Sequence, residues 1–422
     1  MPMHESETRV DEVPREAWTL LALLTALNVL NFVDRQLIAS LAPLLIEDLG
    51  LTRTQIGLLV GYAFVVFYTL VGVLLGAAAD RLPRLPLIAA GLGLWSAMTA
   101  LSGTARSFVQ LAVPRVLVGV GEASLTPAAL GMLGDAFPPR RLGLVTGVYY
   151  AGIPLGLAGS LVVAGWVAPR FGWRACFYVL GALGLASLPL LALVRDPPRR
   201  GGGAAPASRR GAGAQLVALV KGRPELLLVM LGGSALVYAS AAALHAITWL
   251  VQERGMAFAT AAYRAAGMAA VAGFFGNLAG GWVADRCQRR FTGGRLGILV
   301  FLPLFFAPFN VAFLLLPPFS SLFYVCWFMS SASATAYFGP LFAAAQELAP
   351  PQARSSAVAL TLLVANLLGV GPGPWITGMI GDRFSLTAGL LVSIVVSVCA
   401  AVPFAMAARR IGLRPAPAVS EN

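Results

Sequence analysis

The chain has 422 residues, of which 58% are hydrophobic and 11% are charged, and its formal net charge at pH 7 is +12. Soluble domains carry about 25% charged residues, so this composition excludes an ordinary soluble protein and indicates a polytopic membrane protein. A net positive charge also suits a nucleic-acid binder, but the distribution of the basic residues along this chain favours a topological role. We therefore expect no nucleic-acid partner.

Twelve apolar stretches are long enough to cross a bilayer, which requires about 20 apolar residues in a helix. Their approximate limits are 18–42, 55–79, 85–104, 107–135, 141–168, 174–195, 225–250, 260–284, 295–317, 319–348, 355–380 and 386–408.

Basic residues are distributed unevenly between the segments that connect these stretches. If both chain ends lie on one side, that side holds 21 basic residues and the other side holds 7. Loops rich in Lys and Arg stay in the cytoplasm. The sequence thus predicts an integral protein of the plasma (inner) membrane with both termini in the cytoplasm.

The chain reads as two related halves. Residues 195–215 are rich in Gly, Ala, Pro and Arg, which is typical of a flexible linker, and six apolar stretches lie on either side. GAAADRLPR at 76–84 is repeated as GWVADRCQR at 281–289, and WVAPRF at 166–171 as MIGDRF at 379–384. Internal repeats of this kind are typical of transporters that bind substrate between two bundles. We expect a cytoplasmic tail at 1–17, a six-helix bundle at 18–195, a cytoplasmic linker at 196–224, a second six-helix bundle at 225–408 and a cytoplasmic tail at 409–422.

The first apolar stretch carries an unexpected group of polar residues in NVLNFVDRQL, residues 28–37. Asn28, Asn31 and Arg35 follow an i, i+3, i+7 pattern and therefore share one helix face, and Asp34 lies beside it. Ionisable residues inside the membrane cost several kcal/mol and mark functional sites by default.

The fourth stretch carries a matching pair in PRVLVGVGEASLTP, residues 114–127. Arg115 and Glu122 are seven residues apart, which places them on one helix face about 10 Å apart along the axis. Gly119 lies between them on that face and leaves room for a close neighbour. The four charges of Asp34, Arg35, Arg115 and Glu122 sum to zero, so a structural network that pins two helices is the alternative to a functional site.

The two-bundle organisation and the motif Gly76-x-x-x-Asp80-Arg81-x-x-Arg84 resemble the major facilitator superfamily. This resemblance implies an all-α membrane protein with twelve transmembrane helices in two six-helix bundles related by pseudo-twofold symmetry. Pro83 and Leu85 depart from the motif, whereas the second copy keeps its basic residues. We interpret both loops as a cytoplasmic gate, and charge that only sets topology is the alternative. The gate residues would be Asp80, Arg81, Arg84, Asp285 and Arg286.

NFVDRQ in the first stretch and RVLVGVGEAS in the fourth resemble the Spinster-like lipid transporters, whose members move lysophospholipids and sphingosine phosphates. The same Asp-Arg pair and Arg-x6-Glu spacing also occur in the anion:cation symporter family, which carries organic acids such as sugar acids. Both resemblances imply that the first and fourth spans border a central cavity. We expect proton-coupled transport of an amphipathic anionic lipid by alternating access, and a small organic anion is the second choice.

Roles follow from the chemistry of these residues. We assign proton coupling to Glu122 and Asp34, and expect Asp34 to pair with Arg35 or Arg115. A protonated carboxyl group would leave an arginine uncompensated, and that arginine can hold an anion. Substrate binding is assigned to Arg35, Arg115, Asn31, Asn28, His245 and Tyr337. A helix-pinning role is the alternative for His245, and a lipid tail would lie among the seventh, eighth and tenth spans.

Other classes of protein fit the sequence poorly. A membrane-embedded lipid-modifying enzyme needs clustered nucleophiles, His-acid pairs or metal ligands, and the two histidines, His4 and His245, form no such cluster. A Walker A loop needs a lysine after its glycines, and Lys221 in LVKGRP is the sole lysine. We therefore expect no enzymatic activity, no metal, no cofactor and no ATP, with the proton gradient as the source of energy.

Overall fold

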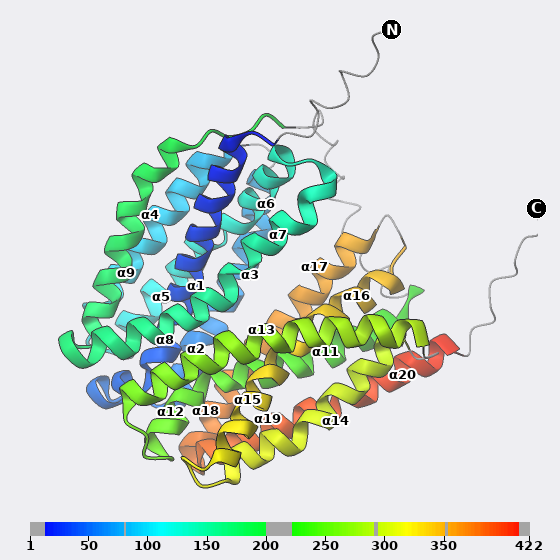
Figure 1. The fold of residues 1–422 in the computed structure, drawn as a ribbon. Helices are drawn as coiled ribbons and strands as arrows, with labels where there is room; N and C mark the ends of the chain where they lie inside the picture. Colours follow the sequence, from blue (N-terminus) through cyan, green and yellow to red (C-terminus); the bar gives the residue numbers. More distant parts are fainter. Residues whose placement is uncertain (1–12, 80–81, 200–221, 291–293, 351–352, 413–422) are drawn as a thin grey trace, which may run out of the picture.

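The computed structural model describes residues 13–79, 82–199, 222–290, 294–350 and 353–412, and helices dominate these segments (Figure 1). Helices suit this apolar chain because in lipid every backbone N–H and C=O must find its partner within the protein. Within the described segments, eleven helices are long and apolar enough to cross a membrane. The remaining predicted stretch, 319–348, is also helical, but it is divided at Tyr337 into helices of 16 and 11 residues.

In the N-terminal half, the six predicted stretches become helices that are often divided in two. They are α1 (Arg15–Leu49), α2 (Arg53–Val60), α3 (Tyr62–Ala79), α4 (Arg84–Ser102), α5 (Phe108–Glu122), α6 (Leu125–Ala136), α7 (Leu142–Tyr150), α8 (Gly152–Phe171) and α9 (Trp173–Ser187), with the 3₁₀ turns η2 (Pro139–Arg141) and η3 (Leu188–Leu193).

The C-terminal half repeats this pattern. Its helices are α11 (Pro224–Ala242), α12 (Ala246–Gln252), α13 (Phe258–Arg290), α14 (Gly294–Leu315), α15 (Ser321–Ala336), α16 (Phe338–Leu348), α17 (Arg354–Ala365), α18 (Pro372–Arg383), α19 (Leu386–Cys399) and α20 (Ala401–Gly412), with the 3₁₀ turn η4 (Ala243–His245) and the π turn η6 (Asn366–Val370).

Some limits differ slightly from the sequence prediction. The first helix begins at Arg15, inside the predicted tail 1–17, and continues through Pro43 to Leu49. The last helix runs to Gly412, past the predicted limit of 408. Most of the predicted linker, residues 200–221, lies outside the described residues.

The two halves join their first and last helices in the same way. At the end of α1, the Asp48 carboxylate accepts hydrogen bonds from Trp173 Nε1 at 3.0 Å and from Arg174 Nη1 at 2.8 Å, at the start of α9. After α12, the Glu253 carboxylate accepts bonds from the backbone N–H groups of Leu386 and Thr387 at 2.5 and 3.0 Å, at the start of α19. An acidic group is favourable at a helix N-terminus because it meets the unpaired N–H groups there.

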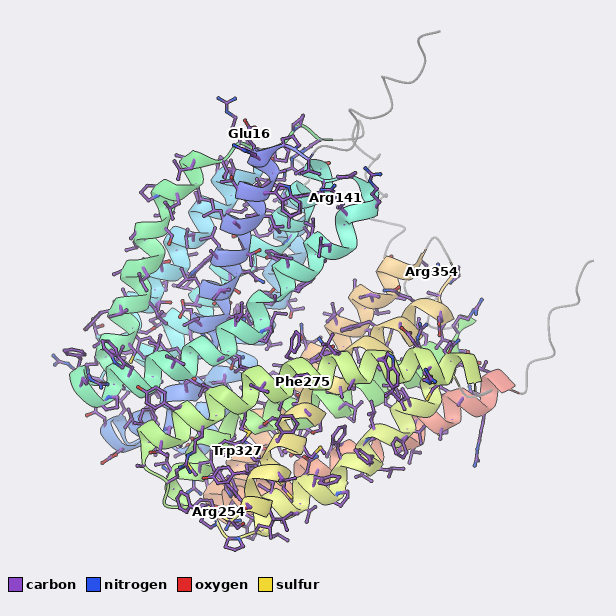
Figure 2. All side chains as sticks on the ribbon, in the orientation of Figure 1. Glu16, Arg141, Arg254, Phe275, Trp327 and Arg354 are labelled. Carbon is purple, nitrogen blue, oxygen red and sulfur yellow. The ribbon has the colours of Figure 1, made fainter. Side chains whose placement is uncertain are left out.

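The bundles diverge towards the end where α1 begins and α20 ends, and they meet at the opposite end (Figure 1). Arg141 and Arg354 mark the separated ends (Figure 2). Where the bundles meet, α2 lies against α18 with almost no side chain between them. A Cβ atom at Gly57 would lie 2.3 Å from the Pro374 carbonyl oxygen, and one at Gly61 would lie 2.4 Å from that of Gly371. Small residues of this kind allow membrane helices to approach closely.

A polar cluster of Arg53, Thr54, Gln252 and Asp382 joins the bundles at this closed end, and we call it the inter-bundle clasp. The Asp382 carboxylate accepts hydrogen bonds from Arg53 N at 2.9 Å, Thr54 N at 2.8 Å and Thr54 Oγ1 at 2.6 Å. The Arg53 guanidinium donates to the Gly381 carbonyl at 2.6 Å and to Gln252 Oε1 at 3.0 Å. Asp382 of α18 thereby caps the N-terminus of α2 across the interface.

Of the predicted gate residues, Asp80 and Arg81 lie outside the described residues. Arg84 is 4% exposed and pairs with Asp135 and Asp196 of its own bundle, each at 2.6 Å.

The gate residues of the C-terminal half also find partners locally. Asp285 binds Arg295 at 2.7 Å, and Arg295 also pairs with Glu347. Arg286 is exposed, and its guanidinium lies over the ring of Trp282. Among the described residues, no ion pair joins the two bundles at the diverging end. A gate that joins them there stays a prediction for a conformation in which that end is closed.

Candidate functional site

The first and fourth spans meet through a buried ion pair. Nε and Nη2 of Arg35, on α1, each lie 3.0 Å from Oε2 of Glu122, the last residue of α5. The Glu122 side chain has no exposed surface, whereas the Arg35 side chain is 19% exposed. Arg35 is therefore the member of the pair that an outside molecule can reach. The helix break that follows Glu122 resembles the discontinuous helices with which transporters build their binding sites.

Arg115 lies behind this pair. It is 3% exposed, its Nη2 donates to the Arg35 carbonyl at 2.6 Å, and its Nε has no partner. The ring of Phe64 lies near both guanidinium groups, with its centroid 4.6 Å from Arg35 Cζ and 4.5 Å from Arg115 Cζ. Gly119 makes this possible, because a Cβ atom there would lie 3.1 Å from the Phe64 carbonyl oxygen. The close neighbour predicted for Gly119 is thus Phe64.

Three aromatic rings surround the guanidinium of Arg35, and we call Phe32, Phe64 and Tyr68 the aromatic box. The distances from Arg35 Cζ to their centroids are 4.6, 4.6 and 4.4 Å. Phe64 and Tyr68 stack on each other, with centroids 5.3 Å apart. Cations are attracted to the faces of aromatic rings, and more strongly where water is excluded. The sequence analysis missed this box, although Phe32 precedes Arg35 by three residues and Tyr68 follows Phe64 by four.

Asp34 has a different partner from the one expected. It is 5% exposed, and its carboxylate accepts a hydrogen bond from Thr99 Oγ1 of α4. Arg35 and Arg115 make no ion pair with it within 4 Å among the described residues, so the expected pairing is wrong for this conformation. The reason is direction: on a helix Asp34 points about 100° away from Arg35, towards the third span. A neutral threonine on a separate span gave no signal in the sequence.

The two asparagines of the stripe are buried. Asn28 is 1% exposed and donates to the Tyr149 carbonyl of α7 at 2.8 Å, which ties the first span to the fifth. Asn31 is 3% exposed, and its Nδ2 has no partner. Asn31 is near enough to Glu122 to act on its carboxylate, so it borders the ion pair, whereas Asn28 serves packing.

His245 and Tyr337 do not bond to the four charged residues. His245 has no exposed surface, and its Nε2 lies 2.9 Å from the Pro374 carbonyl oxygen of α18. This contact favours the helix-pinning alternative for His245. Tyr337 is 3% exposed, and its hydroxyl faces that of Ser240 without closing a hydrogen bond.

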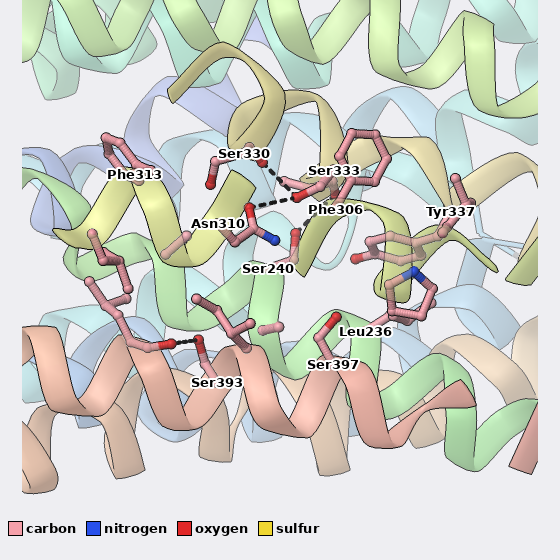
Figure 3. Close-up of a pocket in the computed structure, with 18 of the residues that line it drawn as sticks. Leu236, Ser240, Phe306, Asn310, Phe313, Ser330, Ser333, Tyr337, Ser393 and Ser397 are labelled. Atoms are coloured by element: carbon pink, nitrogen blue, oxygen red, sulfur yellow. Dashed lines mark hydrogen bonds between the residues drawn. The ribbon is translucent and has the colours of Figure 1, made fainter. Parts of the chain in front are cut away.

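Tyr337 lines a cavity of about 100 Å³ that lies inside the C-terminal half, between α11, α14, α15 and α19 (Figure 3). Ser240 Oγ donates across it to the Ala334 carbonyl at 2.9 Å, and Ser333 Oγ lies 3.5 Å from Asn310 Oδ1. These helices belong to the seventh, ninth, tenth and twelfth spans, so two of the three spans expected to house a lipid tail line this cavity. The eighth span, α13, packs against α15 of its own half and against α8 of the other half. Apolar groups complete the lining, including those of Leu236, Ala239, Phe306, Phe313 and Leu390.

Two six-span halves that bury a cluster of ionisable residues define a membrane transporter, and comparisons with known proteins agree. The family model "Major Facilitator Superfamily" matches residues 24–360. An MFS-type efflux pump of Mycolicibacterium smegmatis is 34% identical over 376 residues, which is 88% of this chain and 86% of that protein. Protein spinster homolog 1 of Xenopus tropicalis is 26% identical over 391 residues, covering 87% of this chain and 74% of that one.

Solved structures give the same result. The inward-facing, unoccupied structure of a bacterial homolog to the human lysosomal transporter Spinster superposes with a TM-score of 0.85 at 25% identity, covering 96% of this chain and 99% of that one. Shorter matches include the hexuronate transporter of Bacillus subtilis, 33% identical over 158 residues, which is 37% of each chain. The chain belongs to the major facilitator superfamily. Within it, this protein is a Spinster-like transporter, integral to the membrane.

Proposed function

We propose that this protein is a proton-coupled secondary transporter that moves an amphipathic anionic lipid, such as a lysophospholipid or a sphingosine phosphate, by alternating access. The observation that carries the proposal is the Arg35–Glu122 ion pair, which is buried within the membrane yet reachable at Arg35. Charged groups are costly at this depth, so a pair that can be opened by a proton or an anion has a use beyond packing.

Coupling follows from the charge balance of the site. Asp34, Glu122, Arg35 and Arg115 together carry no net charge when all are ionised. A proton on Glu122 neutralises the carboxylate that holds Arg35 and leaves that guanidinium without its counter-ion. An anionic head group then replaces the carboxylate as the partner of Arg35, so proton and substrate are bound together.

The cavity in the C-terminal half supports a lipid as the substrate. Its lining includes apolar side chains between Leu302 and Leu314 on α14, positions that span about 18 Å along the helix at 1.5 Å per residue. An apolar lining of this kind suits an acyl chain. The serine hydroxyls along it are in part satisfied by backbone carbonyls, as Ser393 is by Leu390 at 2.7 Å, so an apolar chain there leaves few of them unpaired.

The distribution of charge supports a side to which this conformation opens. By the positive-inside rule both termini would lie in the cytoplasm, at the plasma (inner) membrane, so the end at which the bundles diverge would face the cytoplasm. Substrate would be moved without chemical change, so we propose no enzymatic step, cofactor, metal or ATP.

A small organic anion such as a sugar acid is the second candidate. The hexuronate transporter of Bacillus subtilis matches 37% of this chain, and a probable L-galactonate transporter of Escherichia coli matches 42% of it. These substrates need the charged site but no slot for a tail. The two candidates therefore differ in whether the cavity of the C-terminal half takes part.

The deciding experiment uses liposomes that contain the purified protein and a pH-sensitive dye. Lysophospholipids are added in one series and sugar acids in another, under an imposed membrane potential. We expect a lysolipid-dependent proton flux that Glu122→Gln abolishes, because glutamine keeps the shape of the side chain but cannot exchange a proton. Glu16→Gln, at an exposed position of α1, is the matched control and should keep the flux of the unaltered protein.

The outcomes separate the candidates. A flux with sugar acids alone would favour the second candidate. A lysolipid flux that survives in Glu122→Gln would refute the coupling role of Glu122. If neither series produces a flux in protein shown to be folded, the four charged residues would have a structural role and not a role in coupling.

A further inference from the structure

The two arginines of the site differ in what they can offer a substrate. The Arg35 side chain is 19% exposed, whereas Arg115 is 3% exposed and its Nη2 is held by the Arg35 carbonyl at 2.6 Å. Phe64, itself 3% exposed, lies within 4.6 Å of both guanidinium carbons. The ring therefore forms a wall beside Arg115 and leaves Arg35 as the guanidinium that faces outward.

Resting on the function proposed above, we propose that Phe64 limits this site to one available guanidinium and so selects head groups with one net negative charge. A proton on Glu122 changes the sum of the four charges from zero to +1. A head group with one negative charge restores neutrality. A head group with two leaves an uncompensated charge in a buried site, which is strongly unfavourable.

The aromatic box explains how the single guanidinium stays in place after its carboxylate partner is neutralised. The rings of Phe32 and Tyr68, with centroids 4.6 and 4.4 Å from Arg35 Cζ, attract the cation whether or not Glu122 carries a proton. Arg35 thus keeps the position in which it meets a head group. Phe64 is a positioning residue, because it acts through the two arginines.

The test compares two lipids of the same acyl chain in the liposome assay at pH 8. Lysophosphatidylglycerol carries one negative charge, and lysophosphatidic acid, a phosphomonoester, carries close to two. We expect kcat/KM to be about tenfold or more higher for lysophosphatidylglycerol in the unaltered protein, because an unmatched charge is heavily penalised at a buried site.

Variants locate the cause of that preference. Phe64→Leu removes the wall and lets the Arg115 guanidinium, whose Nε has no partner, also meet the head group. It should therefore lower the preference to about threefold or less by improving use of the lipid with two charges. Phe64→Met, which fills more of the ring's volume, should act in the same direction if the leucine variant does not fold. Phe67→Leu is the matched control, since Phe67 lies on the same helix and is 41% exposed, and it should keep the preference of the unaltered protein.

Three results would overturn the proposal: no preference in the unaltered protein, a preference for lysophosphatidic acid, or an unchanged preference in a folded Phe64 variant. A binding measurement keeps this test separate from that of the function itself. Glu122→Gln carries the charge of the protonated site, and its stabilisation by each lipid can be measured by thermal shift in detergent. If no lipid drives flux, the transport proposal fails. The binding preference of Glu122→Gln, compared with that of the double variant Glu122→Gln/Phe64→Leu, still decides the role of Phe64.

Discussion

The two halves of the molecule share a fold but differ in what they bury between their central helices. In the N-terminal half, the first and fourth spans are joined by the Arg35–Glu122 ion pair. In the C-terminal half, the seventh and tenth spans are joined, among the described residues, by a neutral hydrogen bond from Ser240 Oγ to the Ala334 carbonyl at 2.9 Å. The equivalent spans are thus in contact in both halves, and the contact is charged in the N-terminal half.

At the ends of the bundles the two halves remain alike. An acidic residue bonds to the start of the last helix in each half. Asp48 accepts from the side chains of Trp173 and Arg174, and Glu253 accepts from backbone N–H groups. Arg84 and Arg295, each at the start of the third helix of its half, hold two carboxylates apiece. Contacts that hold a bundle together have been kept in both copies, whereas the mid-membrane contacts have diverged. The comparison teaches that the two halves differ at the site proposed for transport and agree at the contacts that hold each bundle together.

Arg84 and Arg295 occupy equivalent positions, and replacing each one tests whether they contribute equally to the free energy of unfolding. Arg84→Met should lower the free energy of unfolding by about 3 kcal/mol, because it leaves two carboxylates without a partner in a largely buried place. Arg295→Met should cost less than about 1 kcal/mol, because its partners Asp285 and Glu347 are 60% and 42% exposed. Thermal unfolding in detergent measures both, and equal losses would contradict the role given to burial.

Filling the cavity of the C-terminal half tests whether this half binds the lipid tail while the N-terminal half binds the charged head group. Ala239→Phe places a ring in the lining and should lower kcat/KM for long-chain lysolipids about tenfold through overpacking of the bound complex. Flux driven by small anions should change little, since they need the charged site alone. Measuring both substrates in one preparation gives the control, and equal losses for both would refute a tail site here.

Breaking the inter-bundle clasp tests whether contacts between the halves set the conformation. Asp382→Asn removes the charge that caps α2, so it should weaken the closed end by about 1 kcal/mol and raise the population closed at the diverging end about fivefold. Spin labels at positions 141 and 354 would report this as a shorter distance by double electron–electron resonance. Asp48→Asn, whose contacts stay within one bundle at the same end, should leave the distance distribution unchanged.

The smallest effect is expected at the neutral counterpart of the ion pair. Ser240→Ala removes one hydrogen bond to a backbone carbonyl and should cost about 0.5 to 1.5 kcal/mol of stability. Proton flux should keep its pH dependence, because no charge is altered. A proton flux that loses its pH dependence in Ser240→Ala would show that both halves take part in coupling.

The helical fold was predictable because the length of apolar stretches and the charge of loops are local properties of the sequence. The thickness of the bilayer fixes the first, and the orientation of the protein depends on the second. The pairing of the first and fourth spans was also accessible, since Arg35 and Glu122 stand out as ionisable residues in apolar surroundings. Thr99 and the aromatic box were not, because threonine and phenylalanine are ordinary in membrane helices and only the packing of separate spans brings them to a charge.

The clasp could not be predicted for a related reason. Arg53 and Asp382 lie near span ends, where charged residues are common, and hundreds of residues separate them in the sequence. Their contact also depends on which end of the transporter is closed. A sequence specifies the whole cycle of conformations, and the structure describes one of them.

Gly57 in α2 and Gly61 directly after it have a consequence for the balance between the two orientations of the transporter. A methyl group at Gly57 would collide with the Pro374 carbonyl oxygen, 2.3 Å away, only while α2 and α18 are in contact. In a transporter that works by alternating access, this steric penalty destabilises the orientation in which α2 and α18 touch and does not affect the orientation in which they separate. A Cβ atom at Gly61 would likewise lie 2.4 Å from the Gly371 carbonyl oxygen, so the same penalty applies at a second position. A single added carbon atom at either glycine would therefore disfavour the orientation in which α2 contacts α18 and leave the other orientation unaffected.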